Sequence, residues 1–380
     1  MESNTGGGSN CPVDALALAR RTRRMWASYP MNRMKKLRVG VIGLGMGRNH
    51  VASFQSHKAA NVVAVTDMDP ARLLEIGDQY GVPGRYTDPY VMIAAEDLDV
   101  VSIATPNCTH KPIALEAFQY GCHVLCEKPI ALNAREGRAM VAAAKKAKRR
   151  LMINFSFRFN AASWGLKKAV DDGALGDIYF GRSVWHRRRD LPGFGGWFST
   201  KALSGGGPLI DLGVHRLDLA LWLMGFPKAE WVMGATYDKL AKPMAEKAGK
   251  PFDVEDLAAG MIRFTNGATL ELEASWTAHI AEKQLMETRL LGTRGGLVQR
   301  NLNQDYQFEA WLHTDRKGKP VDRKIEAVRG RVPTSGWHFI DCITRRVPHT
   351  ATGEEGLAVI EILDALYRSA ASGNPVRLRT

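Results

Sequence analysis

The chain has 380 residues, of which 45% are hydrophobic and 24% charged, and its formal net charge is +13. This composition is typical of a globular protein with a large core and two domains, and no run of about eighteen apolar residues is present to span a membrane. Residues 1–38 carry eight Lys or Arg against Glu2 and Asp14, so nearly half of the positive excess lies in a tail. No basic run is interleaved with aromatic residues, so we expect no nucleic-acid partner.

Residues 1–35 precede the first strand pattern and are expected to form a flexible extension, unless the protein begins at Met31 or Met34. The arginine pair in this segment is not followed by seven or more apolar residues, which argues against an export signal. The five cysteines, at positions 11, 108, 122, 126 and 342, form no CxxC pair. This pattern favours reduced thiols and a cytoplasmic location.

From residue 37 onward, short β-branched runs alternate with helical stretches. Such alternation is typical of parallel βαβ units and predicts a nucleotide-binding sheet in the first half of the chain. One helical stretch, "PARLLEIGDQYG", begins at Pro70 and ends at Gly81. The five expected strands are residues 37–42, 61–66, 99–105, 122–127 and 150–155.

The turn after the first strand reads "GLGMGRNH" and opens a helix. We expect Gly43 to permit the tight turn and Gly45 to let the backbone approach a pyrophosphate, which would rest on the helix N-terminus beside Met46. A strict GxGxxG motif requires glycine at position 48, where this chain has Arg48, and Gly47 comes one residue early. The role of the third glycine, close helix-to-strand packing, is therefore in doubt, although Gly47 remains a candidate cofactor residue.

Asp67 ends the second strand, twenty residues after Gly47. A carboxylate at this place accepts hydrogen bonds from the adenosine ribose hydroxyls and repels a 2′-phosphate, which favours NAD over NADP. Arg72 nearby leaves NADP open, and a helix cap is the structural alternative for Asp67.

Two further strand ends, "TPNCTH" at 105–110 and "EKP" at 127–129, carry polar groups where parallel sheets bind ligands. A lysine beside a proline at a strand end is unusual for a core, because an unpaired buried ammonium is costly. We expect Lys128 to point into the cofactor cleft, with pairing to Glu127 as the alternative, and Pro129 to hold an extended backbone. The candidate cofactor residues here are Thr105, Pro106, Asn107, His110, Glu127 and Lys128.

The second half contains strictly alternating strands such as "TLELEASW", and Asn266-Gly267 between two of them predicts a type I′ hairpin in an antiparallel sheet. Residues 185–207 are expected to form a long glycine-rich loop that binds ligand or moves. Its Trp185, Arg187 and Trp197 are candidates to stack on and hydrogen-bond a polyhydroxylated ring, with surface packing or an oligomer contact as the alternative.

The helical segment "GGGPLIDLGVHRLDLALWLMG" at 205–225 places Asp211, His215 and Asp218 on one stripe, so that a carboxylate and an imidazole stand side by side. A buried polar network is the structural alternative for this stripe. These three residues have no further His, Cys or Glu cluster to complete a zinc site, so we expect no metal.

The glycine turn, "ATPNCTH", "CEKP" and the 205–225 segment, in this order, resemble the Gfo/Idh/MocA family of glucose-fructose oxidoreductase and inositol dehydrogenase relatives. The resemblance covers residues 37–380. It implies a Rossmann domain over 36–155, an α/β substrate and oligomerisation domain with a large, mostly antiparallel sheet over 156–350, and a closing helix within 351–380. It also implies a homodimer or homotetramer and places Arg158 in the cofactor cleft.

The resemblance further implies an NAD(P)-dependent dehydrogenase that acts on a CH–OH group of a sugar, cyclitol or related polyol. In such a reaction His215 takes the hydroxyl proton and Lys128 binds the same oxygen, while Asp211 orients the imidazole or binds a neighbouring hydroxyl. We expect Asp218 to make a structural hydrogen bond rather than clamp His215. Two alternatives are an NAD-dependent glycoside hydrolase with transient oxidation and a catalytically silent NAD-binding regulator.

Overall fold

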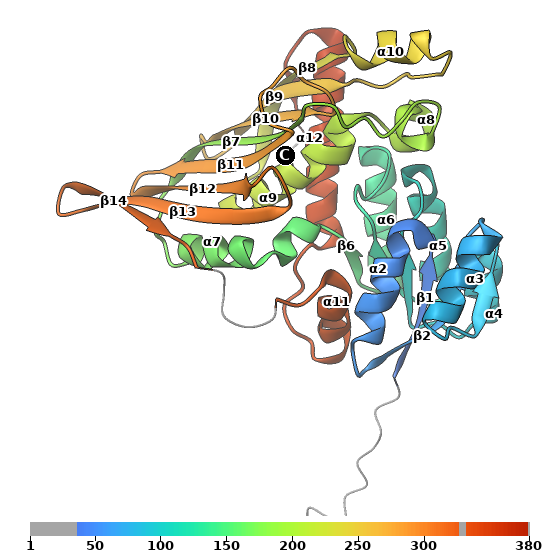
Figure 1. The fold of residues 1–380 in the computed structure, drawn as a ribbon. Helices are drawn as coiled ribbons and strands as arrows, with labels where there is room; N and C mark the ends of the chain where they lie inside the picture. The colour runs from blue at the N-terminus through green and yellow to red at the C-terminus, as the bar shows by residue number, and fades with distance from the viewer. Residues whose placement is uncertain (1–35, 327–331, 379–380) are drawn as a thin grey trace, which may run out of the picture. The chain divides into compact units, whose positions relative to one another are not determined.

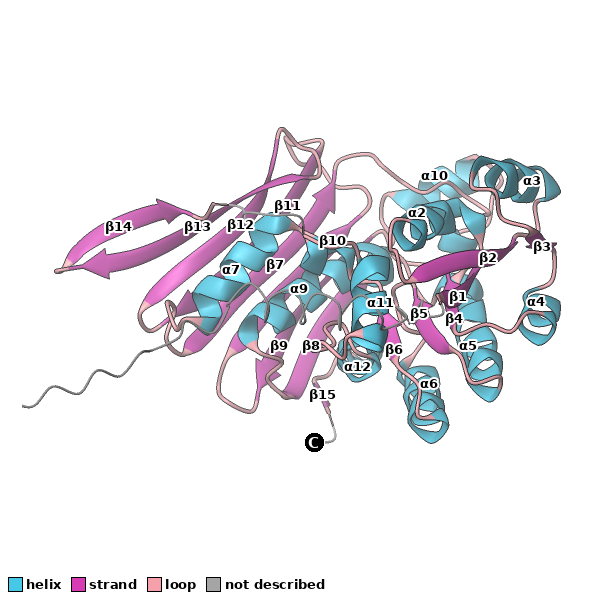
Figure 2. Ribbon diagram, turned by 90° about the horizontal axis from the view of Figure 1, so that it is seen from below, coloured by secondary structure: helices cyan, strands magenta, loops and turns pink. Residues whose placement is uncertain are grey.

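The computed structural model describes residues 36–326 and 332–378. The expectations for residues 1–35, including Cys11 and the two alternative starting methionines, lie outside the described residues. Within the described part, no helix is long and apolar enough to cross a membrane. Figures 1 and 2 show two sheets, each with its own helices.

The first sheet confirms the expected parallel nucleotide-binding sheet, with strand order β3-β2-β1-β4-β5-β6 and parallel pairing throughout. The order reverses between β1 and β4, which leaves a crevice at the carboxyl ends of these two strands. The strands are β1 (Leu37–Ile42), β2 (Ala60–Thr66), β3 (Gly84–Tyr86), β4 (Val100–Ile103), β5 (His123–Cys126) and β6 (Leu151–Ile153). The helices are α2 (Leu44–Gln55), α3 (Pro70–Gln79), α4 (Pro89–Ala95), α5 (His110–Gln119) and α6 (Ala134–Ala147).

The second sheet has nine strands in the order β14-β13-β12-β11-β7-β10-β9-β8-β15. Only the β7–β10 pair is parallel, so the expectation of a large, mostly antiparallel sheet is confirmed. The strands are β7 (Ile178–Arg187), β8 (Ala229–Tyr237), β9 (Leu257–Phe264), β10 (Thr269–Ser275), β11 (Gln284–Gly292), β12 (Gly295–Leu302), β13 (Gln307–Arg316), β14 (Lys319–Lys324) and β15 (Val376–Arg377).

One face of the second sheet is covered by the helices α7 (Ala161–Asp171), α9 (Val214–Met224) and α12 (Gly353–Ser372), as Figure 2 shows. Three positions of one cross-strand row on that face illustrate the packing: Gly260 lies against Leu366 of α12, Ser183 bonds a carbonyl of α9, and Gln299 bonds a serine of α7. The remaining helices of the described part are α8 (Lys201–Ser204), α10 (Ala241–Lys247) and α11 (Ser335–Thr344).

The hairpin between β9 and β10 is present, but its predicted turn type is wrong. Gly267 has φ +85°, whereas Asn266 is not among the residues with positive φ, and a type I′ turn requires positive φ at both central positions. The N–H of Gly267 instead donates to the carbonyl of Phe264, and Phe264 N–H bonds the carbonyl of Ala268. This is a three-residue connection in which only the glycine is left-handed.

Candidate active site

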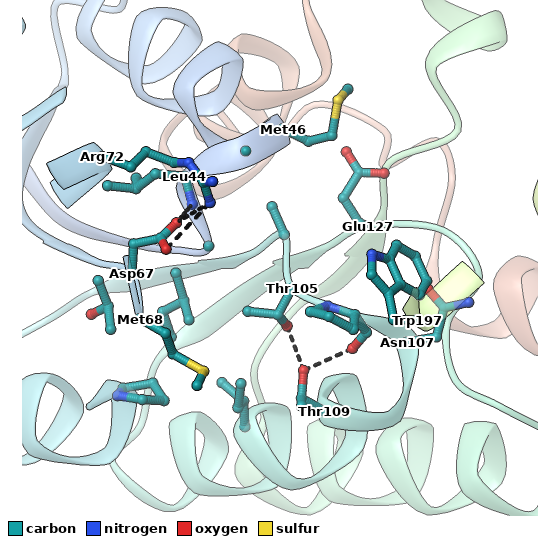
Figure 3. Close-up of a pocket in the computed structure, with 18 of the residues that line it drawn as sticks. Leu44, Met46, Asp67, Met68, Arg72, Thr105, Asn107, Thr109, Glu127 and Trp197 are labelled. Carbon is teal, nitrogen blue, oxygen red and sulfur yellow. Dashed lines mark hydrogen bonds and ion pairs between the residues drawn. The ribbon is translucent and has the colours of Figure 1, made fainter. Parts of the chain in front are cut away.

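A pocket of about 880 Å³ lies at the carboxyl ends of β1, β2, β4 and β5, where the strand order reverses. Figure 3 shows Asp67 and Glu127 at opposite ends of this pocket, with Thr105 between them. The sequence-predicted residues that line it are Gly43, Gly45, Met46, Asp67, Thr105, Pro106, Asn107, Glu127, Lys128 and Trp197.

The glycine turn has a different role at each of its three glycines. Gly43 has φ +82°, and a Cβ there would lie 2.6 Å from the carbonyl oxygen of Ala104. A Cβ at Gly45 would meet nothing within 4 Å, so this position leaves open space at the start of α2. Gly47 is buried, does not line the pocket, and a Cβ there would lie 3.1 Å from Val41 of β1. The doubt about helix-to-strand packing is thus corrected, because Gly47 provides it one residue earlier than the strict motif.

Asp67 stands at the end of β2 with its carboxylate held by the backbone. It accepts hydrogen bonds from the N–H groups of Leu44 (2.7 Å) and Asp69 (2.9 Å). The guanidinium of Arg72 approaches the same carboxylate at 3.3 Å and also pairs with Asp69. Asp69, and not Asp67, caps α3, so the helix-cap alternative for Asp67 is wrong.

Glu127 follows β5, and its carboxylate contacts the side chains of His50 and Asn154. Its Oε1 lies 2.9 Å from Nε2 of His50 and 2.6 Å from the Nδ2 donor of Asn154. Nδ1 of His50 lies 2.7 Å from the hydroxyl of Ser102. Burial opposes ionisation of Glu127, but the hydrogen bond and charge of His50, the hydrogen bond from Asn154 and the charge of Lys128 together lower its pKa to about 2.

The ammonium of Lys128 pairs with Asp211 and not with Glu127, so the alternative pairing is wrong. Its Nζ lies 2.8 Å from Oδ1 of Asp211 and 3.1 Å from the Asp211 carbonyl oxygen. The other carboxylate oxygen of Asp211 accepts the indole N–H of Trp276 at 3.0 Å. Burial favours the neutral acid, but the Lys128 ammonium and the indole lower the pKa of Asp211. The Lys128–Pro129 peptide bond is cis.

His215 lies on α9 beside this pair, between two aromatic rings. Its ring centroid is 5.0 Å from that of Phe157 and 5.8 Å from that of Trp185. Its Nδ1 is buried and has no hydrogen-bond partner among the described residues. Burial, assisted by the Lys128 ammonium, lowers the pKa of His215 well below 6.5. The imidazole is therefore neutral near pH 7, which is the form that accepts a proton.

Asp211, His215 and Asp218 do not form the single stripe that we expected: Asp211 contacts Lys128, whereas Asp218 contacts Arg158. Asp211 lies in a π-helical turn, Leu209–Gly213, whereas His215 and Asp218 lie in the α-helix that follows. Asp218 is fully buried and accepts two hydrogen bonds from Arg158, from Nη2 at 2.6 Å and from Nε at 2.9 Å. Its carboxylate thus makes the structural contact that we expected and has no bond to His215.

Arg158 does not belong to the cofactor pocket, which corrects the position implied by the resemblance. Its guanidinium has no exposed surface and binds Asp218, Glu355 (2.7 Å) and Thr350 (3.3 Å). Burial alone would lower the pKa of Arg158, but the carboxylates of Asp218 and Glu355 together raise it. This network ties α9 to the start of α12.

His110 is likewise removed from the candidates for direct cofactor contact. It is fully buried and absent from the pocket lining, and its two ring nitrogens lie 2.9 Å from the carbonyl oxygen of Pro129 and 3.0 Å from that of Thr105. Burial lowers the pKa of His110. The imidazole therefore connects the two strand-end loops that line the pocket.

The three expected substrate residues lie on two different elements. Trp185 and Arg187 belong to β7, which extends to residue 187, so the expected loop begins later than predicted. Trp185 is buried, and the guanidinium of Arg187 lies 5.3 Å from its ring and donates to Tyr306. Trp197 begins a short 3₁₀ turn, stacks on Phe198 with centroids 3.7 Å apart and faces the pocket.

Several residues that position the site were not identified from the sequence. Glu255 is buried, and its carboxylate accepts the N–H groups of Gly207 and Leu209 and the hydroxyl of Tyr367. A Cβ at Gly206 would lie 2.0 Å from that hydroxyl, and the glycine triplet is explained by such close approaches. Trp276 and His50 were also missed, because only the fold brings them to Asp211 and Glu127.

A dinucleotide fits this pocket. The open space above Gly45, at the N-terminus of α2, suits a pyrophosphate, and Asp67 suits a ribose. Among the described residues, no three His, Cys, Asp or Glu side chains are grouped to hold a metal ion.

Comparison with known proteins agrees with this geometry. A family model described as an oxidoreductase family with an NAD-binding Rossmann fold matches residues 37–155, and a GFO/IDH/MocA C-terminal domain model matches residues 165–298. D-glucoside 3-dehydrogenase of Escherichia coli is 33% identical over 90% of this chain and 97% of its own length. Myo-inositol 2-dehydrogenase of Thermotoga maritima is 26% identical over 90% of this chain and 98% of its own.

Solved structures give the same picture. The complex of levoglucosan dehydrogenase with NADH and levoglucosan is 26% identical, with a TM-score of 0.79 over 91% of this chain and all of the other. The structure of GenD2 from gentamicin A biosynthesis, in complex with NAD, is 27% identical, with a TM-score of 0.73 over 92% of this chain and 98% of the other.

Proposed function

Because the chain belongs to the GFO/IDH/MocA family of NAD-binding oxidoreductases, we propose that it oxidises a secondary hydroxyl of a sugar, cyclitol or related polyol with NAD as the hydride acceptor. The relatives named above act on glucosides, inositol and levoglucosan, which supports this substrate class. NAD is favoured over NADP because the carboxylate of Asp67 stands at the ribose end of the pocket.

The observation that carries the proposal is the Lys128–Asp211 pair beside the neutral His215. Lys128 lines the pocket at the end away from Asp67, where the nicotinamide half of a dinucleotide would extend, and its ammonium pairs with Asp211. Here an ammonium, fixed by a carboxylate at 2.8 Å, stands near a group able to accept a proton. An alcohol dehydrogenation needs a group that stabilises the developing negative charge on oxygen and a group that accepts the hydroxyl proton, and these side chains can supply both.

In the proposed reaction, Lys128 donates a hydrogen bond to the substrate oxygen and stabilises the negative charge that develops on it. Asp211 holds the ammonium in place and is itself held by the indole of Trp276. His215 accepts the hydroxyl proton, so that a carbonyl can form as hydride leaves the carbon. NAD, when bound, supplies the hydride acceptor.

Two other functions of this fold are weaker candidates. A glycoside hydrolase with transient oxidation would cleave an aryl glycoside without net NADH formation. A silent NAD-binding regulator would lack the acid–base groups, whereas Lys128, Asp211 and His215 are all in place here. The expectations of a homodimer or homotetramer and of a cytoplasmic location remain predictions.

The test is a substrate screen with purified protein, NAD and a panel of inositols, hexoses and glucosides. We expect NADH absorbance to rise with at least one member of the panel. Lys128→Met and His215→Ala should abolish this signal with cofactor affinity largely retained. Full turnover in both variants would overturn the proposed roles.

A further inference from the structure

The carboxylate of Glu127 lies at the nicotinamide end of the pocket. Asp67 ends β2 and marks the adenosine half, because a carboxylate there suits a ribose. Across the sheet, β5 lies on the other side of β1 and β4, and Glu127 follows it directly. Figure 3 shows the two carboxylates on opposite sides of Thr105. A dinucleotide that extends from Asp67 therefore brings its nicotinamide toward Glu127 and Lys128.

His50 and Asn154 hold the carboxylate of Glu127. Nε2 of His50 lies 2.9 Å from Oε1 of Glu127, and its Nδ1 lies 2.7 Å from the hydroxyl of Ser102, which is fully buried. Asn154 donates a hydrogen bond to the same oxygen of Glu127 at 2.6 Å. These contacts fix the carboxylate, and its pKa of about 2 leaves Glu127 ionised near neutral pH.

Lys128 is the cation next to Glu127. Its charge lowers the pKa of Glu127, but its ammonium forms an ion pair with Asp211, at 2.8 Å. Burial lowers the pKa of His110 and that of His215. Glu127 thus contributes one negative charge to the nicotinamide end of the pocket.

The nicotinamide ring is cationic in NAD⁺ and neutral in NADH. We propose that Glu127, oriented by His50 and Asn154, makes this site distinguish the oxidation state of its cofactor by binding NAD⁺ more tightly, relative to NADH, than an uncharged site would. The inference rests on the proposed function only through the binding of NAD. It assigns Glu127 an electrostatic role that is separate from the proton transfer at His215.

The size of the effect follows from the charge. One unit charge within about 10 Å, at an effective dielectric constant of about 20, changes an affinity by roughly tenfold. We therefore expect Glu127→Gln, which keeps the size of the side chain, to weaken NAD⁺ binding about tenfold and to change NADH binding by less than about twofold. A tenfold change corresponds to about 1.4 kcal/mol.

The experiment measures dissociation constants of NAD⁺ and NADH by calorimetric titration without any sugar, at about pH 8, above the ordinary titration range of histidine. The outcome does not depend on whether the protein oxidises a polyol, so failure here is distinguishable from failure of the proposed function. Asp67→Asn is the matched control, because it removes a carboxylate at the adenosine end, which both forms share. We expect it to weaken both forms by the same factor.

Retained NADH binding by Glu127→Gln shows that its pocket is folded. Should this variant bind neither form, His50→Lys decides the question, because His50 does not line the pocket and the lysine would place an ammonium, kept protonated by the carboxylate that it faces, beside Glu127. We expect that variant also to lose affinity for NAD⁺ and not for NADH. Equal changes for both forms, or no change for either, in the variant that binds cofactor would overturn the role of Glu127.

Discussion

Replacing Asp218 by asparagine should mainly reduce stability, whereas the same replacement of Asp211 should mainly reduce turnover. Asp218 and Arg158 are both fully buried and form two hydrogen bonds with each other. Asp218→Asn removes the charge and leaves the guanidinium next to an amide group. Removing one partner of a buried ion pair costs about 3–5 kcal/mol. Because Glu355 still binds Arg158, we expect the free energy of unfolding to decrease by about 3 kcal/mol.

Asp211→Asn should instead reduce turnover. Asp211 is partly exposed, and its loss leaves Lys128 with the backbone carbonyl at 3.1 Å as its remaining partner. A misplaced ammonium stabilises the developing negative charge poorly, so we expect kcat to fall by about 10²-fold. The free energy of unfolding should decrease by about 1–2 kcal/mol, less than for Asp218→Asn, because the asparagine oxygen can still accept the hydrogen bond from Lys128 Nζ.

Urea unfolding followed by tryptophan fluorescence measures the stability of both variants, and NADH formation measures kcat. Asp172→Asn is the control, because its pair with Lys168 is an exposed i,i+4 pair, and its effect should stay within about 0.5 kcal/mol. The reasoning would be refuted if Asp218→Asn were as stable as this control, or if it lost kcat to the extent that Asp211→Asn does.

Three further predictions concern the pocket. Lys128→Met should lower kcat by about 10²-fold or more while the dissociation constant of NAD, measured by titration, changes by less than about threefold. Burial lowers the pKa of His215 well below 6.5, so kcat/KM should stay level as the pH falls from about 8 to about 6; a decline centred at or above about 6.5 would contradict the role of the neutral imidazole. Gly206→Ala would place a Cβ 2.0 Å from the Tyr367 hydroxyl and should lower the free energy of unfolding by about 1–3 kcal/mol, measured by thermal unfolding. Gly45→Ala meets no atom within 4 Å, so it should leave the stability unchanged and weaken cofactor binding, measured by titration.

The fold was predictable because its signals are local. The β-branched runs predicted five of the six strands of the first sheet to within a few residues and missed β3, a three-residue strand at its edge. The alternation in β10 and the Asn266-Gly267 pair indicated an antiparallel hairpin, whereas the large, mostly antiparallel sheet was implied by the resemblance. The hairpin at Asn266-Gly267 was found for the same reason, but its turn type was not, because the backbone angle of Asn266 depends on the register of β9 and β10.

The site was only partly predictable because its contacts join distant segments. Lys128 and Asp211 are 83 residues apart, and no local sequence pattern indicates that Lys128 pairs with Asp211 rather than with the adjacent Glu127. Glu255 and Trp276 appear unremarkable in the sequence, and their roles follow from backbone N–H groups and a carboxylate that the fold places beside them. The cis bond after Lys128 is likewise a property of the folded chain.

Because of the π-helical turn at Leu209–Gly213, the position of Asp211 depends on the exact number of residues in this segment. An ordinary α-helix advances about 100° per residue, so deleting one residue from the wide turn would convert it to regular helix and rotate everything before it by about that angle. Asp211 would then turn away from Lys128, while His215, which follows the turn, would stay in place. Apart from substitution of Asp211 itself, a change of one residue in the length of this turn should therefore disturb the reaction more than a substitution within it.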